Sequence, residues 1–393
     1  MSSDLQERVD LARTVAELLA DLGGEERLRE VVAGDGWDEA LWRRVLDLGV
    51  LELALAANRD ADGGSYADLA VVFAELGRAL APVPALTTVA VATVLDLSGT
   101  PAAAELAEDV VSGRVRAALV LPGDGGTWGG RTPLRARSTN GAWTVDGTVE
   151  LVTDAPGVDQ LVVLADTDDG ACFFVVPTGP AVTITPVPAL DLTRTLGSVA
   201  LTAAPATPLT TPDRTDAVLA RTLDVCAGLL AAESAGLARR ALDSAVDYAK
   251  IRVQFDRPIG SFQAVKHSCA EMLLMVEGAR CLADAAADAL DEGDPGAASL
   301  AAGVARGYAG ETAVECAERC LHLHGGIGFT WEHVSHLVVR RAKSDAVRFG
   351  RPAEHWDRVA RRLATGTPGA APAVAAAAVA DPAVEAAVGA PVG

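Results

Sequence analysis

The residues best suited to chemistry in this chain lie in the stretch YAKIRVQFDRPIGSFQAVKH, from Tyr248 to His267. The stretch interrupts a long helical pattern at a turn that contains proline and glycine, and it carries Arg252, Gln254 and Phe255 just before that turn. An arginine beside an aromatic ring suits a ligand that combines a phosphate with a flat ring. The alternative is a helix corner whose arginine merely covers apolar surface, and this segment alone leaves both interpretations open.

A second candidate stretch, LHLHGGIGFTWEH, runs from Leu321 to His333. Its glycines either let the backbone approach a ligand closely or simply turn the chain between two helices. The histidines around it invite a metal site, but no set of carboxylates or cysteines completes a coordination shell, so we expect no metal. The glycines are Gly325, Gly326 and Gly328, and the histidines are His322, His324, His333 and His336.

The composition favours a globular protein that does not bind nucleic acid. Half of the 393 residues are apolar and 22% are charged, which is enough for a large buried core. The net charge of −20 would repel the phosphates of nucleic acids. The six cysteines show no paired metal-ligand spacing, and Cys316 and Cys320, one helical turn apart, are interpreted as buried free thiols.

Neither a membrane span nor a secretion signal is expected. The sequence has no run of 18 or more apolar residues, which a membrane-crossing helix would need. The first residues, MSSDLQERVDLART, lack the basic and then apolar layout of a signal peptide. The sequence therefore predicts a cytoplasmic protein.

The elements that must position the candidate residues change type along the chain. Residues 1–113 predict a helical domain, because apolar residues recur every three or four positions, and Ser65 is expected to cap the segment YADLAVVFAELGRALA. Residues 114–212 carry short β-branched runs broken by Gly, Asp and Pro, which favour strands in a compact sheet or barrel.

Residues 213–365 predict a bundle of four helices, at about 213–250, 261–292, 297–324 and 331–349. Residues 366–393 are rich in Ala, Pro, Val and Gly and predict a disordered tail. The predicted fold class is therefore α+β, mostly α, with a helical N-terminal domain, a central β-sheet or β-barrel domain and a C-terminal four-helix bundle.

Taken together and in this order, the two candidate stretches resemble those of the acyl-CoA dehydrogenase family. The resemblance extends over nearly the whole chain, to about Ala364. In the N-terminal part it includes WRRVLDLGVLELAL and DGGSYADLAVVFAELGRALAP, and in the middle it includes GAWTVDGTVELVTDAPGVDQLVVLA. Members of the family have the same succession of helices, β-domain and four-helix bundle.

The resemblance implies FAD-dependent oxidation of an acyl-CoA to a 2-enoyl-CoA, with an electron-transfer flavoprotein or a similar acceptor taking the electrons. In such enzymes a carboxylate removes the proton alpha to the thioester carbonyl while hydride leaves the beta carbon for the flavin. The cofactor lies between two subunits, one holding the flavin ring against its β-domain and the other holding the adenosine diphosphate with its bundle. A homo- or hetero-oligomer, dimeric or tetrameric, is therefore expected.

The resemblance also assigns contacts to single residues. Arg252, Gln254 and Phe255 match the positions that reach the diphosphate and adenine of the neighbour's FAD. Val152 and Thr153 fall where the β-domain touches the flavin ring. The apolar positions that line the adenosine side match Ile259, Phe262 and Val265, and the double glycine whose backbone approaches the cofactor matches Gly325 and Gly326.

The positions of the catalytic acid depart from the family pattern. The usual base is a Glu seven residues after the alanine of an Ala-Lys pair, and here that residue is Phe349. Some members place the Glu on the first bundle helix, 22 residues before the tyrosine of the first motif, where this chain has Cys226. Neither position holds a carboxylate.

Other expected contacts are altered too. The arginine that often grips the CoA arm is replaced by Ala227, and the glutamine before the double glycine is replaced by His322, whereas Asp224 retains a family acid that contacts substrate. The β-domain loop that normally reads Thr-Glu-Pro and then Gly-Ser-Asp is LPGDGGTWGGR here, residues 121–131. That loop normally supplies contacts to flavin and thioester.

Glu233 is the remaining candidate for the base. It lies seven residues beyond Cys226, about 10 Å along one helix, in the otherwise apolar segment LLAAESAGLA. A buried carboxylate there needs a partner or a raised pKa. The alternative to a catalytic Glu233 is an ion pair with an arginine of the next helix.

Three functions remain open at this stage. The first is a self-sufficient acyl-CoA dehydrogenase with Glu233 as its base. The second is the non-catalytic partner in a heteromeric acyl-CoA dehydrogenase, like the α2β2 enzymes that oxidise steroid side-chain CoA thioesters. The third is a scaffold or binding protein that kept the fold and lost FAD. The second is favoured, because Arg252 and Phe255 are retained while the base and the β-domain loop are not.

Overall fold

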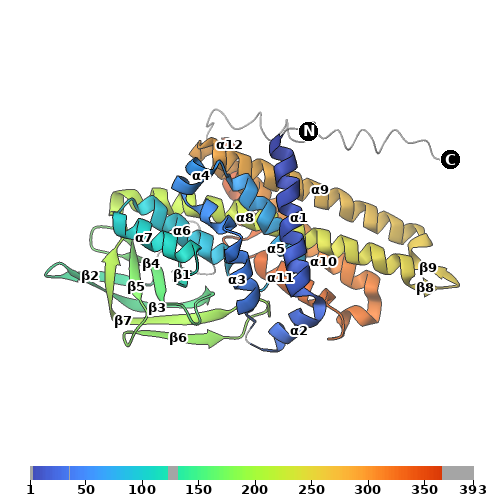
Figure 1. Cartoon of the computed structure of the whole chain (residues 1–393), viewed down its shortest axis with the longest axis horizontal. Coiled ribbons are helices and arrows are strands. Elements are labelled where there is room, and N and C mark those ends of the chain that lie inside the picture. Colours follow the sequence, from blue (N-terminus) through green and yellow to red (C-terminus); the bar gives the residue numbers. More distant parts are fainter. Residues whose placement is uncertain (1–2, 35, 123–131, 365–393) are drawn as a thin grey trace.

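The computed structural model of the chain describes residues 3–34, 36–122 and 132–364. Along the chain, helices come first, a strand-rich middle part follows, and further helices come after it (Figure 1). This order confirms the predicted fold class. The predicted tail lies outside the described residues. No helix within the described ranges combines the length and apolar composition that crossing a bilayer requires. We propose domain boundaries near residues 113 and 212, where the strand-rich part begins and ends.

The N-terminal part is formed by helices, among which α1 packs against α5. Ser65 caps α5 as predicted, because its side chain accepts a hydrogen bond from the Asp68 N–H at 3.1 Å. Helix α5 ends where Leu80 adopts a left-handed conformation with φ 55°. The elements are α1 (Ser3–Gly23), α2 (Glu25–Ala33), α3 (Glu39–Asp47), η1 (Val50–Ala54), α4 (Ala56–Asp62), α5 (Tyr66–Ala79), α6 (Ala85–Ser98) and α7 (Pro101–Val111).

The middle part is a closed β-barrel. Strand β4 pairs with β1, β2 and β5, and the path β4–β5–β7–β3–β2 returns to β4, while β6 pairs with β7. Alternate residues of one strand therefore face different cores: Leu161 and Val163 point into the barrel, and Val162 and Leu164 pack on the helices. The strands are β1 (Ala117–Val120), β2 (Arg135–Thr139), β3 (Ala142–Thr153), β4 (Gln160–Asp166), β5 (Ala171–Pro177), β6 (Val182–Val187) and β7 (Leu196–Pro208).

The C-terminal part contains three long helices, as predicted, and two short ones. The expected fourth helix at 331–349 is shorter than predicted, because α11 ends at Asp345 and a separate helix begins at Pro352. The elements are α8 (Pro212–Ile251), β8 (Val253–Gln254), β9 (Arg257–Pro258), η2 (Ile259–Ser261), α9 (Gln263–Glu292), α10 (Pro295–His324), η3 (Gly325–Phe329), α11 (Ser335–Asp345) and α12 (Pro352–Ala364).

Helices α5 and α8 join the N-terminal part to the bundle through two glycines. A Cβ atom on Gly77 would lie 2.0 Å from the Glu233 carbonyl oxygen, and one on Gly236 would lie 1.8 Å from the Ala74 carbonyl oxygen. Because both obstacles are backbone atoms of the facing helix, only glycine permits this close approach. The crossing brings Glu233 next to the N-terminal part.

We expect Gly236→Ala to reduce the free energy of unfolding by about 2–3 kcal/mol or more, since the new methyl group must push the two helix backbones apart. The control is Gly228→Ala on the same helix, whose Cβ would meet two side-chain atoms and no backbone, Leu290 Cδ1 at 3.1 Å and Ala286 Cβ at 3.9 Å. The control should change stability by less than about 1 kcal/mol. Urea unfolding of both variants measures this, and equal midpoints would contradict the close crossing.

Candidate functional site

The structure brings Phe349 into one small cavity with the predicted flavin contacts Val152 and Thr153. The cavity also includes Thr87 and Arg348 among its lining residues, so it lies between α6, the end of β3 and the loop that joins α11 to α12. Phe349 is 5% exposed and stands where the family places its usual base.

This cavity has room for about one water molecule. Its volume is about 20 Å³, and a buried water needs roughly 10–15 Å³ measured in this way. On its polar wall the Thr87 hydroxyl donates to the Asp154 carboxylate at 2.6 Å, and Nη1 of Arg348 lies 3.9 Å from Asp345 Oδ1. The ring of Phe349 therefore closes the site, and a flavin ring does not fit there in this conformation.

The loop that carries Phe349 is held by two buried side chains that the sequence analysis did not single out. Arg306 on α10 donates through Nη2 to the carbonyls of Asp345 and Arg348. His355 on α12 donates through Nε2 to the Phe349 carbonyl at 2.9 Å. Burial lowers the pKa of His355 to about 4, so its ring is neutral at neutral pH. Phe349 is thus held in its left-handed conformation, with φ 52°.

Cys226, at the second family position for the acid, is fully buried. Burial raises the pKa of its thiol to about 12, so the side chain is uncharged at neutral pH and is a poor base. Ala227 beside it is also fully buried and offers no group that could grip a CoA arm. Cys226 packs in the main hydrophobic core.

Glu233 is buried, 2% exposed, and lies between two arginines. Its Oε1 atom accepts from Arg341 on α11 at 2.6 Å and from Arg194, which lies in the segment before β7. Burial alone would raise the pKa of Glu233, but Arg194 and Arg341 together hold it below the ordinary value. An ion pair was expected with an arginine of the next helix, and the partners instead come from two other elements. This geometry favours a structural role over that of a base.

Asp224, the expected substrate contact, also has an internal partner. Its carboxylate is buried and lies 2.7 Å from Nη2 of Arg358 on α12. Burial raises the pKa of Asp224, although Arg358 acts against it. The predicted bounds of the fourth helix left out α12, so this partner could not be foreseen.

The other predicted cofactor residues lie at the far end of the bundle. Arg252 ends α8, and Gln254 and Phe255 lie on the hairpin of β8 and β9. Phe255 is 85% exposed with φ 52°, and its ring meets the ring of Phe262 edge-on at 6.0 Å. Ile259, Phe262 and Val265 are each half-buried beneath the hairpin.

The glycine-rich turn lies at the same end, because the ring of Tyr248 near the end of α8 stacks at 4.4 Å on His324 at the end of α10. A Cβ atom on Gly325 or Gly326 would meet nothing within 4 Å, so the backbone there is open to a ligand. His322 is exposed, and its ring Nδ1 lies 3.1 Å from the Glu318 carbonyl. Within the described ranges no three His, Cys, Asp or Glu side chains gather as metal ligands would.

The two groups of predicted FAD contacts are far apart in this chain. The cavity with Val152, Thr153 and Phe349 adjoins the barrel, whereas the β8–β9 hairpin lies at the opposite end of the long helices (Figure 1). The 121–131 loop lies mostly outside the described residues, so its contacts are not assigned.

We expect Glu233→Gln to reduce the free energy of unfolding by about 3–5 kcal/mol, since it leaves two buried arginines short of a counter-charge. Because the pKa of folded Glu233 lies below its ordinary value of 4.5, this contribution is complete above about pH 4.5 and is lost as the pH falls below it. The control is Glu318→Gln, which breaks an exposed pair with Lys343 and should cost less than about 1 kcal/mol. Denaturant unfolding at pH 7 and pH 4 compares them. A Glu233→Gln loss no larger than the control would contradict the structural role.

Comparisons with known proteins identify relatives over nearly the whole chain. The family described as "Acyl-CoA dehydrogenase, C-terminal domain" matches residues 217–364. Acyl-CoA dehydrogenase IpdE2 of Mycobacterium tuberculosis (strain ATCC 25618 / H37Rv) is 34% identical over 360 residues, which are 91% of this chain and 96% of the relative.

Two further similarities bear on assembly. Acyl-CoA dehydrogenase FadE34 of the same organism is 38% identical over 306 residues, which are 77% of this chain but only 39% of the relative. The crystal structure of the ChsE4–ChsE5 complex from Mycobacterium tuberculosis matches with a TM-score of 0.83 and 29% identity, covering 94% of this chain and 99% of that chain. On the strength of the full-length match, this chain belongs to the acyl-CoA dehydrogenase family, whose members are FAD-dependent oxidoreductases.

Proposed function

We propose that the chain is the non-catalytic subunit of a heteromeric acyl-CoA dehydrogenase, in which it completes the FAD site of a catalytic partner. The observation that carries this proposal is the Phe349 cavity. Phe349 stands at the position of the base and, with Arg348 and Thr153, leaves a space of about 20 Å³. The second acid position, Cys226, is a buried thiol. The chain therefore lacks both a base and room for the reacting groups.

This chain has groups that suit the adenosine side of an FAD site but not the flavin side. The hairpin and glycine turn offer an exposed guanidinium, an exposed aromatic ring and open backbone at Arg252, Phe255 and Gly326. These groups suit a diphosphate and an adenine. The Phe349 cavity does not suit a flavin ring. We therefore assign the chain an adenosine-side contribution and no reaction step of its own.

The distance between the two regions supports a contribution to another chain's cofactor. Cys226 lies in one core with Phe349, and Arg252 follows Cys226 by 26 positions (252 − 226) along and just beyond α8. At 1.5 Å per residue this separation is about 39 Å. Residues so far apart serve different cofactors. Arg252 and Phe255 then hold the FAD whose ring lies in the partner.

In the assembled enzyme FAD would accept a hydride from the substrate. The proposed part of this chain is to bind and orient that cofactor. The Arg252 guanidinium would neutralise diphosphate charge, Gln254 would add a polar contact, and the Phe255 ring would cover the adenine. Ile259, Phe262 and Val265 would form the apolar floor. The partner would supply the carboxylate that removes the alpha proton, and an electron-transfer flavoprotein or a similar acceptor would reoxidise the flavin.

Two relatives support assembly with a second acyl-CoA dehydrogenase chain. One solved structure that this chain resembles is a complex of two proteins, ChsE4 and ChsE5. The match to FadE34 spans 39% of that relative, so FadE34 has room for a second unit of similar size. We propose a partner of the same fold. In this proposal the acyl group of the substrate binds in the partner's site.

The self-sufficient enzyme with Glu233 as base is the less favoured alternative. The arginines Arg194 and Arg341 both contact Glu233 Oε1 and hold the pKa of Glu233 low, which makes the carboxylate a weak base. A scaffold without FAD is disfavoured by Arg252 and Phe255, because both side chains are exposed at the hairpin and open to a ligand.

The isolated, purified chain should form 2-enoyl-CoA from acyl-CoA at a rate about 10²–10⁴-fold below that of the assembled enzyme, because it lacks a general base. Co-expression with a partner that carries the glutamate should restore turnover. Phe349→Glu in the isolated chain should not restore it, since the cavity remains too small for the flavin ring. The measurement is enoyl-CoA formation with an artificial electron acceptor. Robust turnover by the isolated chain that disappears in Glu233→Gln would reject the proposal in favour of the self-sufficient enzyme.

In the assembled enzyme, Arg252→Ala should weaken FAD binding tenfold or more, which corresponds to about 1.5–3 kcal/mol for a charge-assisted hydrogen bond. Lys250→Ala is the matched control, because Lys250 lies in the last turn of α8 and pairs with Asp247 at 3.0 Å on the surface. Flavin content after dialysis against FAD-free buffer reports the difference. Equal flavin retention in both variants would favour the scaffold alternative.

A further inference from the structure

We infer that the groove between α1, α2, α5 and α8 binds a carboxylic acid with an apolar body. The groove has a volume of about 400 Å³, which lies within the range of small-molecule sites. It is separate from the Phe349 cavity and from the β8–β9 hairpin, with which it shares no lining residue. Nothing in the proposed function uses it, and the inference does not rest on that function.

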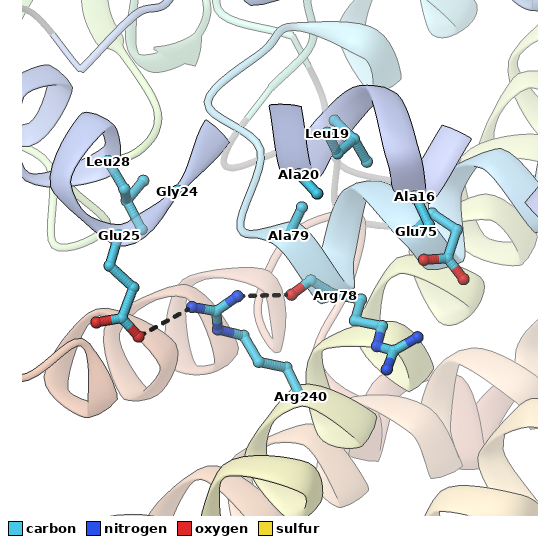
Figure 2. A pocket seen from close by; sticks show the side chains of 10 residues that line it. All are labelled: Ala16, Leu19, Ala20, Gly24, Glu25, Leu28, Glu75, Arg78, Ala79 and Arg240. Atoms are coloured by element: carbon cyan, nitrogen blue, oxygen red, sulfur yellow. Dashed lines mark hydrogen bonds and ion pairs between the residues drawn. The ribbon is translucent and has the colours of Figure 1, made fainter. Parts of the chain in front are cut away.

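The groove has an apolar wall and a charged end (Figure 2). Leu19 and Leu28 are both buried, and they form the wall together with three alanines of α1 and α5. The alanines leave the space that larger side chains would fill. Those alanines are Ala16, Ala20 and Ala79.

Arg240 is the cation that a carboxylate would meet. Its Nη1 donates to the Arg78 carbonyl at 3.0 Å, and its Nη2 stands 3.8 Å from Glu25 Oε1, beyond hydrogen-bond distance. Figure 2 shows the guanidinium reaching across the groove between these two groups. Burial lowers the pKa of Arg240, which reflects the loss of water around it. A ligand carboxylate would supply the hydrogen bonds that Glu25 does not.

The other charged side chains that line the groove are less suited than Arg240 to bind a carboxylate. Arg78 points away from Arg240 in Figure 2 and pairs with Asp243 at 3.0 Å. Glu25 is half-exposed, so it can turn to water when a ligand binds. Burial raises the pKa of Glu75, whose carboxyl group also lines the groove.

A second cavity extends the charged end. It has a volume of about 210 Å³ and shares Glu25, Arg78 and Arg240 with the groove. Its remaining polar side chains include Asp243, Ser244 and Ser335. The Ser335 hydroxyl lies 2.6 Å from Nδ1 of His333 and the Ser244 hydroxyl lies 3.5 Å from Nε2 of His324, so the guanidinium is the group that a carboxylate would meet. The apolar part of the ligand therefore lies between α1 and α5, and its carboxylate lies at Arg240.

Isothermal titration of the full chain with decanoate tests this site. Decanoate should bind, Arg240→Gln should weaken the affinity about tenfold or more, and Ala20→Trp should abolish binding by filling the groove. Ala20 is exposed at the rim, so its replacement leaves the fold intact even if Arg240→Gln does not fold. Arg44→Gln, an exposed arginine of α3, is the control and should bind like the wild type.

Two ligands of equal chain length distinguish the head group. 1-Decanol and decylamine should bind at least tenfold more weakly than decanoate, because neither presents an anion to Arg240. Absence of decanoate binding would overturn the inference. So would equal affinity for decanoate and 1-decanol, or decanoate binding that is unchanged in both Arg240→Gln and Ala20→Trp, since the ligand would then lie elsewhere.

Discussion

One buried cluster of charges ties the three parts of this chain together. Glu233 on α8 accepts from Arg194 of the β-domain and from Arg341 of α11. Arg341 also donates to Asp191 at 2.6 Å and to the Ala81 carbonyl at 3.3 Å, which connects the N-terminal helices. Replacing such a cluster with apolar residues is often neutral, whereas removing one member costs several kcal/mol. In this chain the cluster specifies how the N-terminal helices, the barrel and the bundle are arranged. The close crossing of α5 and α8 at two glycines lets Glu233 approach the N-terminal helices.

The closed cavity follows from that arrangement. Asp345 lies beside the cluster, and burial raises the pKa of its carboxyl to about 6. The loop that follows it is then held from two sides, by Arg306 at the Arg348 carbonyl and by His355 at the Phe349 carbonyl. With its backbone fixed, Phe349 points into the space between α6 and β3. An apolar ring is stable in this buried space, where a carboxylate would need a hydrogen-bond or charge partner.

Local sequence pattern predicted the elements that have strong local signals. The cap at Ser65 and the long bundle helices were predicted, because a cap residue and a helical repeat are properties of a short segment. Strand β7 (Leu196–Pro208) was not predicted, because its sequence contains no continuous β-branched run. It is a strand because β3, β5 and β6 pair with it. Helix α12 was not predicted, because Pro352 at its start was interpreted only as the end of a helix. At the site, Phe349 and Cys226 could be located by spacing, but the partners of Glu233 and Asp224 come from residues up to 134 positions away and no local pattern indicates them.

The exposed surface at the β8–β9 end has a physical meaning that the isolated chain does not explain. Phe255 is 85% exposed, Ile251 is 76% exposed and Val253 is 53% exposed, and large apolar side chains gathered on one surface favour association. Phe255 and Asp256 form the two-residue turn between β8 and β9, and their positive φ values of 52° and 63° are those that such a hairpin turn requires. The turn therefore explains the backbone conformation, whereas the exposure of the side chains favours a ligand or chain that covers the hairpin. We propose that this chain, whose Phe349 cavity has room for about one water molecule, contributes the exposed hairpin to the cofactor site of a neighbouring subunit.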